Sequence, residues 1–139
     1  MLVDKRGAPL SVVITGANRH DKTAAVDLIV SIVVERPDKK QHLCADKAYD
    51  STDVRAFVTL EGYTPHIKLN PRNSKSKEPE PQGLAEATHP ARRWVVERTL
   101  SWLTKRRSVR TRWSKKSANW LALVQFACAH ILFNMAVFG

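Results

Sequence analysis

Residues 41–69, QHLCADKAYDSTDVRAFVTLEGYTPHIKL, decide the fold of this chain. The pattern predicts a strand over 41–45, a charged turn over 46–50, a helix over 52–60 and a strand over 64–69. Ser51 is typical of a helix N-cap, and Gly62 is expected to end the same helix. A strand–helix–strand order of this length favours two parallel strands joined by a crossover helix.

The segment before this unit predicts a hairpin and a further helix. Met1–Asp4 and Pro9–Thr15 are rich in strand formers, and a polar turn over 5–8 separates them. Asp21 is a candidate N-cap for a helix that ends before Pro37. The apolar positions of that helix repeat at spacings of three and four: Ala24, Ala25, Leu28, Ile29, Ile32 and Val33. Strands that alternate with helices predict an α/β fold with a parallel sheet.

The segment after the unit has three parts. Residues 70–91 contain four prolines among polar residues, which predicts a flexible surface connection or a short insertion. Residues 92–107 have helical periodicity, and 118–137 form a final helix in an uncharged stretch over 117–138. That stretch is long enough for a membrane span, but Asn119, His130 and Asn134 fall near one face. We therefore expect a buried apolar helix, with a membrane or interface helix as the alternative.

The charge of the chain is concentrated in one segment. The 139 residues suffice for one domain, and 23 basic against 13 acidic side chains give a net charge of +10. Residues 92–116 hold ten of the basic side chains and a single acid, Glu97. Such a segment suits a polyanion, most simply nucleic acid, although an anionic membrane or a merely solvated helix face would also fit.

Composition excludes several classes of protein. The apolar fraction of 43% argues against a disordered chain. Cys44 and Cys128 are far apart and have no metal-ligand spacing, so neither a zinc site nor a disulfide framework is indicated. No apolar signal segment opens the sequence, and we expect a reduced, cytoplasmic protein.

Two acids are candidates for chemistry. Asp46 follows the strand over 41–45, at the sheet edge where α/β proteins gather ligands, but a turn or capping role is equally reasonable. Glu97 lies among bases, where an ion pair with Arg93 worth about 0.2–0.5 kcal/mol is the simpler reading. A carboxylate in a phosphate-binding surface makes more sense if it binds a divalent cation. Two such acids could hold Mg²⁺ or Mn²⁺ for phosphodiester chemistry, and a two-metal site ordinarily needs a third.

Four ordered segments carry a resemblance to a known family. They are Leu2–Leu10 (LVDKRGAPL), Gly16–Asp21 (GANRHD), Leu43–Asp50 (LCADKAYD) and Arg92–Thr99 (RRWVVERT), the last continued by Trp102, Leu103, Arg106 and Arg107. Over essentially its whole length the chain resembles the catalytic domain of bacterial insertion-sequence DDE transposases. The resemblance implies an RNase H-like mixed sheet flanked by helices, and cleavage and joining of DNA with Mg²⁺ held by an Asp–Asp–Glu triad.

The resemblance also assigns roles to residues. The second Asp of the triad corresponds to Asp46 and the Glu to Glu97, which makes both of them catalytic metal ligands. The basic segment over 92–116 then faces DNA, with Arg93, Arg98, Lys105, Arg106, Arg107, Arg110 and Arg112 as candidate contacts. The implied partners are double-stranded DNA at transposon ends and targets, and a second copy in a homodimer on paired ends. The implied location is the bacterial nucleoid, with no membrane.

The chain departs from the family pattern at its start. In the family the first triad Asp lies upstream of the segment resembling Leu2–Leu10, so Asp4 does not fill that position. The Tyr and Lys positions that accompany the Glu hold Pro90 and Thr104. We therefore expect the C-terminal portion of a transposase, incomplete at its N-terminus and inactive without the upstream segment. The alternative is a non-catalytic DNA-binding or regulatory fragment.

Overall fold

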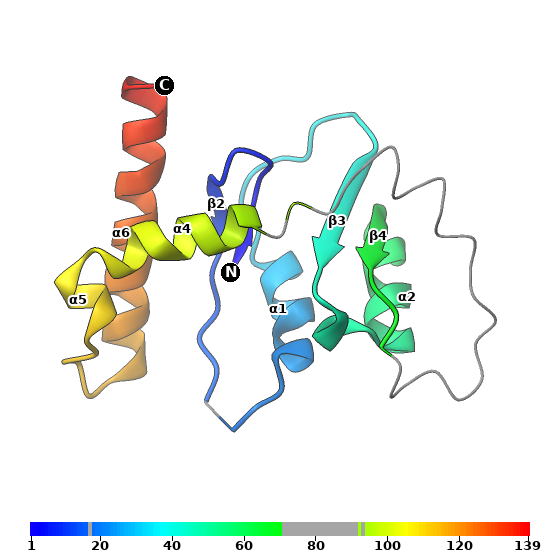
Figure 1. Cartoon of the computed structure of the whole chain (residues 1–139), viewed down its shortest axis with the longest axis horizontal. Helices are drawn as coiled ribbons and strands as arrows, with labels where there is room; N and C mark the ends of the chain where they lie inside the picture. Colours follow the sequence, from blue (N-terminus) through cyan, green and yellow to red (C-terminus); the bar gives the residue numbers. More distant parts are fainter. Residues whose placement is uncertain (17, 71–91, 93) are drawn as a thin grey trace. The chain divides into compact units, whose positions relative to one another are not determined.

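The protein, described from a computed structural model, consists of two compact units (Figure 1). The structure describes residues 1–16, 18–70, 92 and 94–139. One unit, here called the α/β unit, comprises Arg19–Val26 and Glu35–Arg93, and the other, the helical unit, comprises Met1–Asn18, Asp27–Val34 and Trp94–Gly139. The expected connection or insertion over 70–91 lies, apart from Asn70, outside the described residues.

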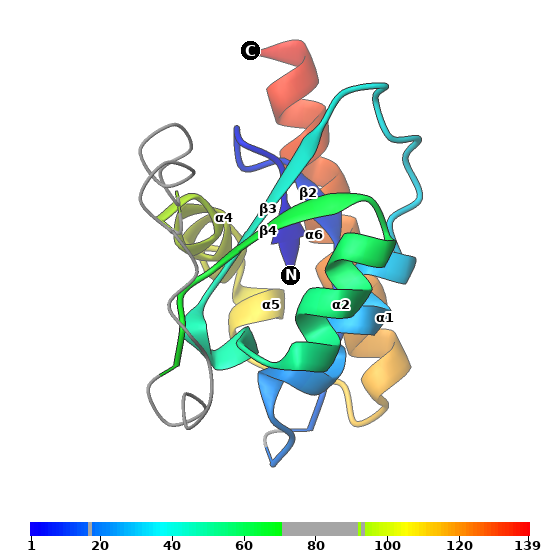
Figure 2. The ribbon, with the colours of Figure 1, turned by 90° about the vertical axis from the view of Figure 1, so that its right-hand side faces the viewer.

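A parallel strand pair forms the centre of the α/β unit. Strand β3 (Gln41–Ala45) pairs in parallel with β4 (Tyr63–Ile67), in a continuous register from Gln41 opposite Tyr63 to Ala45 opposite Ile67. Helix α2 (Thr52–Leu60) connects them and packs on β4 (Figure 2). The predicted strand–helix–strand unit is confirmed, although β4 begins and ends earlier than the predicted 64–69.

Local signals explain where α2 begins and ends. The Ser51 hydroxyl accepts a hydrogen bond from the Val54 N–H at 3.3 Å, as an N-cap does. Gly62 has a φ of +77°, and its N–H donates to the Thr59 carbonyl, which closes the helix. Val54 and Val58 are the buried residues of the helix. The predicted cap and terminator of α2 are therefore confirmed.

The helix expected after Asp21 has a different start. A short 3₁₀ turn, η1 (Asp21–Ala24), precedes α1 (Ala25–Val30), and the N-cap position is His20. The expectation that Asp21 caps this helix is wrong, because the turn already begins at that residue, with the Thr23 N–H and hydroxyl both bonded to the His20 carbonyl. The helix also ends at Val30, and Val33, expected on its apolar face, is 91% exposed.

The N-terminal hairpin belongs to the helical unit. Strand β1 (Leu2–Val3) pairs antiparallel with β2 (Pro9–Ser11), which confirms the hairpin but shortens its second strand. One carboxylate oxygen of Asp4 accepts hydrogen bonds from the backbone N–H groups of Arg6 and Ala8, each at 2.8 Å. Asp4 therefore stabilises the hairpin turn.

Three helices complete the helical unit: α4 (Trp94–Thr104), α5 (Arg107–Arg110) and α6 (Ser117–Val137). They enclose an apolar cluster of Leu103, Val109, Val124, Ala127, Cys128 and Ile131. Trp102 and Trp120 are partly buried against this cluster, as are Met1, Val12 and Met135. The cluster therefore joins all three helices to the start of the chain.

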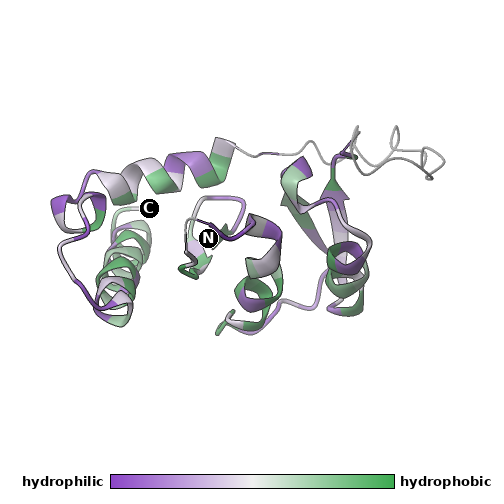
Figure 3. Cartoon of the chain, turned by 90° about the horizontal axis from the view of Figure 1, so that it is seen from below, coloured by the Kyte–Doolittle hydropathy of each residue, from purple (hydrophilic) through white to green (hydrophobic). Residues whose placement is uncertain are grey.

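The prediction of a buried helix over 117–138 is correct for its extent and wrong for its burial. Only Val124, Ala127, Cys128 and Ile131 of α6 are buried, whereas Phe126 is 75% exposed. The helix contacts α4, α5 and β2 along one stripe, and no described residue covers its opposite face. Figure 3 shows hydrophobic residues along much of its length. By length and composition α6 would suffice to cross a membrane.

The strands of the described residues form two sheets of two strands each, β1–β2 and β3–β4. The sequence predicted a single mixed sheet. The described strands do not form it, because β1 hydrogen-bonds only to β2 and β3 only to β4. The result is a mixed α/β architecture that is compatible with an RNase H-like domain.

Candidate functional site

Asp46 lies immediately after β3 and caps a 3₁₀ turn, η2 (Lys47–Tyr49). Its Oδ1 atom accepts a hydrogen bond from the Lys47 N–H at 2.7 Å, and its side chain is exposed. Both interpretations of this residue are thus compatible with its position: it caps a turn, and it stands at the carboxyl end of a parallel strand, where ligands bind in α/β sheets.

Asp50 is a buried acid whose role the sequence did not indicate. It is 4% exposed, and its Oδ1 atom accepts a hydrogen bond from Arg55 Nε at 2.8 Å. Its Oδ2 atom accepts from the Asn70 N–H at 2.7 Å, while Arg55 Nη2 donates to the Ile67 carbonyl at 2.5 Å. These contacts hold the end of β4 against the start of α2 and explain why β4 ends at Ile67. Asp50 and Arg55 are five residues apart, and no recognised sequence motif has an ion pair at that spacing.

Glu97 projects from the first turn of α4 in the helical unit and is exposed. Within the described part of the chain its side chain forms no hydrogen bond or ion pair, and its predicted partner Arg93 lies outside that part. Asp46 belongs to the α/β unit. The two candidate metal ligands therefore come from different units.

Arg98, a predicted DNA contact, is engaged inside the helical unit. Its guanidinium lies over the rings of Trp94 and Trp102, at 4.8 and 5.0 Å from their centroids. Its Nη2 atom donates to the Arg6 carbonyl at 2.6 Å, and the neighbouring Thr99 hydroxyl donates to the Gly7 carbonyl at 2.8 Å. Arg98 thus helps attach α4 to the hairpin turn.

Two more predicted contacts are also engaged by the protein itself. The Arg106 guanidinium contacts the His130 ring on α6. Arg112 donates through Nε to the Ser114 carbonyl at 3.1 Å and through Nη2 to the Lys115 carbonyl at 3.2 Å. These side chains position helices and loops, which leaves less of each guanidinium to meet a ligand.

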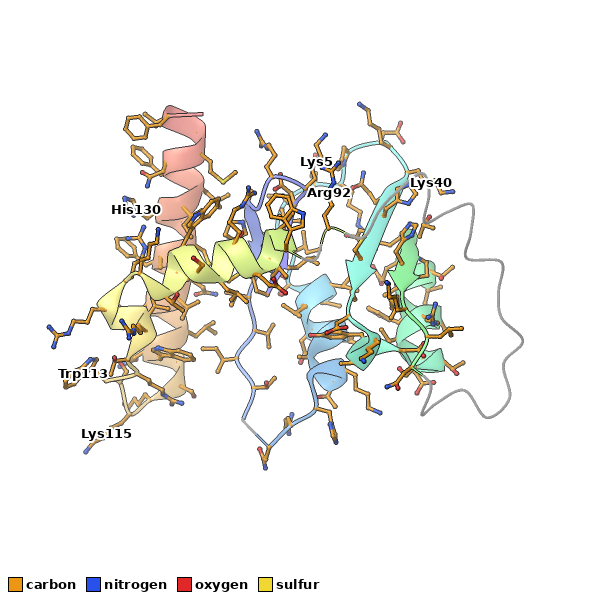
Figure 4. The ribbon with its side chains drawn as sticks, in the orientation of Figure 1. Lys5, Lys40, Arg92, Trp113, Lys115 and His130 are labelled. Atoms are coloured by element: carbon orange, nitrogen blue, oxygen red, sulfur yellow. The ribbon has the colours of Figure 1, made fainter. Side chains whose placement is uncertain are left out.

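Five other cations of this segment, all in the helical unit, are available on the surface. Lys105, Arg107 and Arg110 are exposed and make no side-chain hydrogen bond or ion pair to another described residue. Lys115 and Lys116 are exposed on the loop that follows α5. Lys115 extends away from the helices in Figure 4. We call these five side chains the exposed basic set.

Comparison with known proteins identifies the family of this chain. The family model for the transposase DDE domain matches residues 1–132. The chain belongs to the transposase DDE domain family. It is also 30% identical over 140 residues to a Burkholderia cepacia protein named "Putative transposase for insertion sequence element IS402", an alignment that covers 96% of this chain and 61% of that protein. The chain thus spans about three fifths of the length of this relative. No solved structure matches it.

Dependence on a divalent metal ion is general in the transposase DDE domain family. The carboxylates of Asp46 and Glu97 are the oxygen donors that Mg²⁺ and Mn²⁺ prefer. The described residues nevertheless contain no group of three or more His, Cys, Asp or Glu side chains placed to hold a metal ion. The donor type fits a divalent metal, but the described residues do not assemble a complete site.

Proposed function

We propose that this chain is the part of an insertion-sequence transposase that binds DNA at the ends of the element and contributes two acids to metal-dependent cleavage and strand transfer. The observation that carries the proposal is the exposed basic set, which follows α4 at Lys105, continues on α5 and ends on the loop before α6, in a member of the transposase DDE domain family. Cations on a rigid helical scaffold suit the regularly spaced phosphates of a duplex.

In this proposal Asp46 and Glu97 hold Mg²⁺ or Mn²⁺ in a two-metal arrangement that a third acid, from an upstream segment, completes. When bound, the metal ions lower the pKa of the attacking water and stabilise the leaving oxygen of the phosphodiester. Lys105, Arg107 and Arg110 hold the DNA backbone. We propose that two copies act on paired ends in the cytoplasm, at the nucleoid.

A strand-transfer assay tests the catalytic part. We expect no transfer by the chain alone, and Mg²⁺-dependent transfer once the upstream coding segment of its element is joined to it. In the joined protein, Asp46→Ala and Glu97→Ala should each abolish transfer. The matched control is Asp53→Ala, because Asp53 is an exposed acid in the first turn of α2. Transfer that survives both single substitutions would disprove the assignment.

A second candidate function is a non-catalytic DNA-binding regulator that competes with full-length transposase. The observation that favours it is the capping role of Asp46 together with the lack of a three-acid group among the described residues. DNA binding that weakens steeply with salt, without cleavage even in the joined protein, would support this function over the first.

The apolar face of α6 makes a membrane the remaining alternative. We propose that the chain is not a membrane protein. We expect it in the soluble fraction of a lysate at high salt, and extraction only by detergent would contradict this.

A further inference from the structure

Trp113 is an exposed indole at the tip of the loop between α5 and α6. It is 73% exposed, whereas Trp102 and Trp120 are partly buried against the apolar cluster. In Figure 4 its side chain, like that of Lys115, extends away from the helices. Leaving a large aromatic ring in water forgoes the stabilisation that its burial would provide. Trp is enriched where proteins meet other molecules, because its ring is apolar and its N–H is polar, so this indole is a candidate for ligand contact.

The loop that carries Trp113 is held by internal contacts. Arg112 bonds the carbonyls of Ser114 and Lys115, so a single guanidinium bridges both residues that follow the indole. The same guanidinium lies over the Trp120 ring at 5.6 Å from its centroid. Because Trp120 packs on the apolar cluster, the loop is anchored to the core. The indole is therefore presented on a preorganised support, which lowers the entropic cost of binding.

The surroundings of Trp113 are cationic. Arg110 precedes it at the end of α5, and Lys115 and Lys116 follow it, all with exposed side chains. No Asp or Glu occurs in the sequence after Glu97. A ligand that contacts the indole therefore meets positive charge on both sides of it along the chain.

We infer that Trp113 stacks on an unpaired nucleobase of DNA while Arg110, Lys115 and Lys116 contact the adjacent phosphates. Aromatic side chains beside cations are the usual means of binding single-stranded nucleic acid, because every base offers a face for stacking. A fully paired duplex offers no such face except at its ends. The inference rests on the proposed DNA-binding function and adds the class of substrate: DNA with unpaired nucleotides near the bound duplex.

A binding experiment with two DNA probes tests this inference. The full chain is titrated into a fluorescently labelled blunt duplex and into the same duplex with a single-stranded tail, and binding is followed by anisotropy. We expect Trp113→Ala to weaken binding of the tailed probe by about 5- to 150-fold, and to weaken binding of the blunt duplex, which offers only its terminal base pairs for stacking, by far less. Trp113→Phe should restore most of the loss, since the phenyl ring also stacks.

Two further variants serve as controls. Phe138→Ala removes an aromatic ring that is 79% exposed at the opposite end of α6, and it should change neither affinity. Arg110→Ala should weaken both probes and reduce the salt dependence of binding, because it removes a phosphate contact. Tryptophan emission gives a second readout: the tailed probe should quench the wild-type protein, and Trp113→Phe should reduce that quenching.

The outcomes separate this inference from the proposed function. If wild type binds both probes and Trp113→Ala weakens them equally or not at all, base stacking is disproved and DNA binding stands. If wild type binds neither probe, both fail. If Trp113→Ala changes only self-association in sedimentation, the indole is a protein contact and the inference is wrong.

Discussion

The two units are stabilised by different chemistry. The α/β unit places Asp46 next to a network of polar contacts, in which the buried Asp50–Arg55 ion pair holds β4 to α2. The helical unit places its exposed cations on α5 and on the segments that flank it, and its helices pack through an apolar cluster. Asp46 and the exposed basic set therefore depend on separate supports, whereas Glu97 shares the helical unit with the basic set. A substitution that destabilises one unit should therefore have an effect that can be told apart from that of a substitution in the other unit.

The largest expected effect comes from removing the buried acid of the α/β unit. Asp50→Ala leaves Arg55, whose side chain is 19% exposed, without its ion-pair partner, and it also removes the acceptor of the Asn70 N–H. We expect a loss of about 3–5 kcal/mol in the free energy of unfolding, measured by urea denaturation. Asp53→Ala on the surface of the same unit should change it by no more than about 0.5 kcal/mol. An equally small effect of Asp50→Ala would mean that the ion pair does not support this unit.

The corresponding change in the helical unit creates a cavity. Leu103→Ala removes a side chain that is 3% exposed in the apolar cluster, and we expect a loss of about 2–5 kcal/mol. The control is Leu100→Ala, at a position of α4 that is 43% exposed. Urea denaturation followed by far-UV circular dichroism checks both variants. A larger loss for Leu100→Ala than for Leu103→Ala would contradict the described packing of α4.

A smaller effect is expected where the helical unit uses a polar contact. Thr99 is fully buried, and its single hydroxyl proton lies between two acceptors, the Gly7 carbonyl at 2.8 Å and the Val95 carbonyl at 3.1 Å. Thr99→Val keeps the shape but leaves the Gly7 carbonyl without this donor, which should cost about 1–3 kcal/mol. Thermal unfolding checks the loss, and Thr99→Ser should retain more of the stability than Thr99→Val. If the two variants are equally stable, the hydroxyl makes no net contribution.

Each unit contains one cysteine, and chemical labelling of the two thiols compares the units without changing their stability. Cys44 is exposed on β3, and Cys128 is buried in the cluster. Desolvation raises the pKa of both thiols, so their pKa shifts have the same direction. Their labelling rates should therefore differ mainly because Cys44 is more accessible to the reagent. We expect a thiol reagent to label Cys44 first at neutral pH, as read by mass spectrometry of the digested protein. Both thiols should label faster as pH rises towards their pKa values, and labelling of Cys128 first would contradict its burial.

Local signals explain why the α/β unit was predictable. The Ser51 cap, the Gly62 terminator and the short apolar run before the charged turn act within a few positions of each other, and they predicted β3, α2 and most of β4. The Asp50–Arg55 pair was not predictable, because its other partners, Ile67 and Asn70, are brought to it only by the crossover.

The helical unit was less predictable for two reasons. The apolar composition of residues 117–138 predicted the helix α6, but composition does not determine how many faces of that helix pack against other elements. A basic residue in a basic segment resembles a DNA contact, yet Arg98 is held by Trp94, Trp102 and the Arg6 carbonyl. Trp94 and Trp102 lie one helical turn either side of Arg98, so local spacing could have indicated the two ring contacts. The Arg6 carbonyl is 92 positions away, and no local pattern could have revealed that contact. The assignment of Asp46 and Glu97 as metal ligands remains a prediction.

The hydrogen bond between Thr99 and Gly7 also bears on the order of folding during synthesis. It joins residues 92 positions apart, whereas β3 and β4 join Gln41 to Tyr63 and α2 lies between them. A ribosome releases the strand pair and its helix long before α4 exists, and short-range contacts form faster than distant ones. The α/β elements can therefore form while the hairpin at the start of the chain still waits for its helical partner. In that interval the hairpin depends on its own turn, held by Asp4.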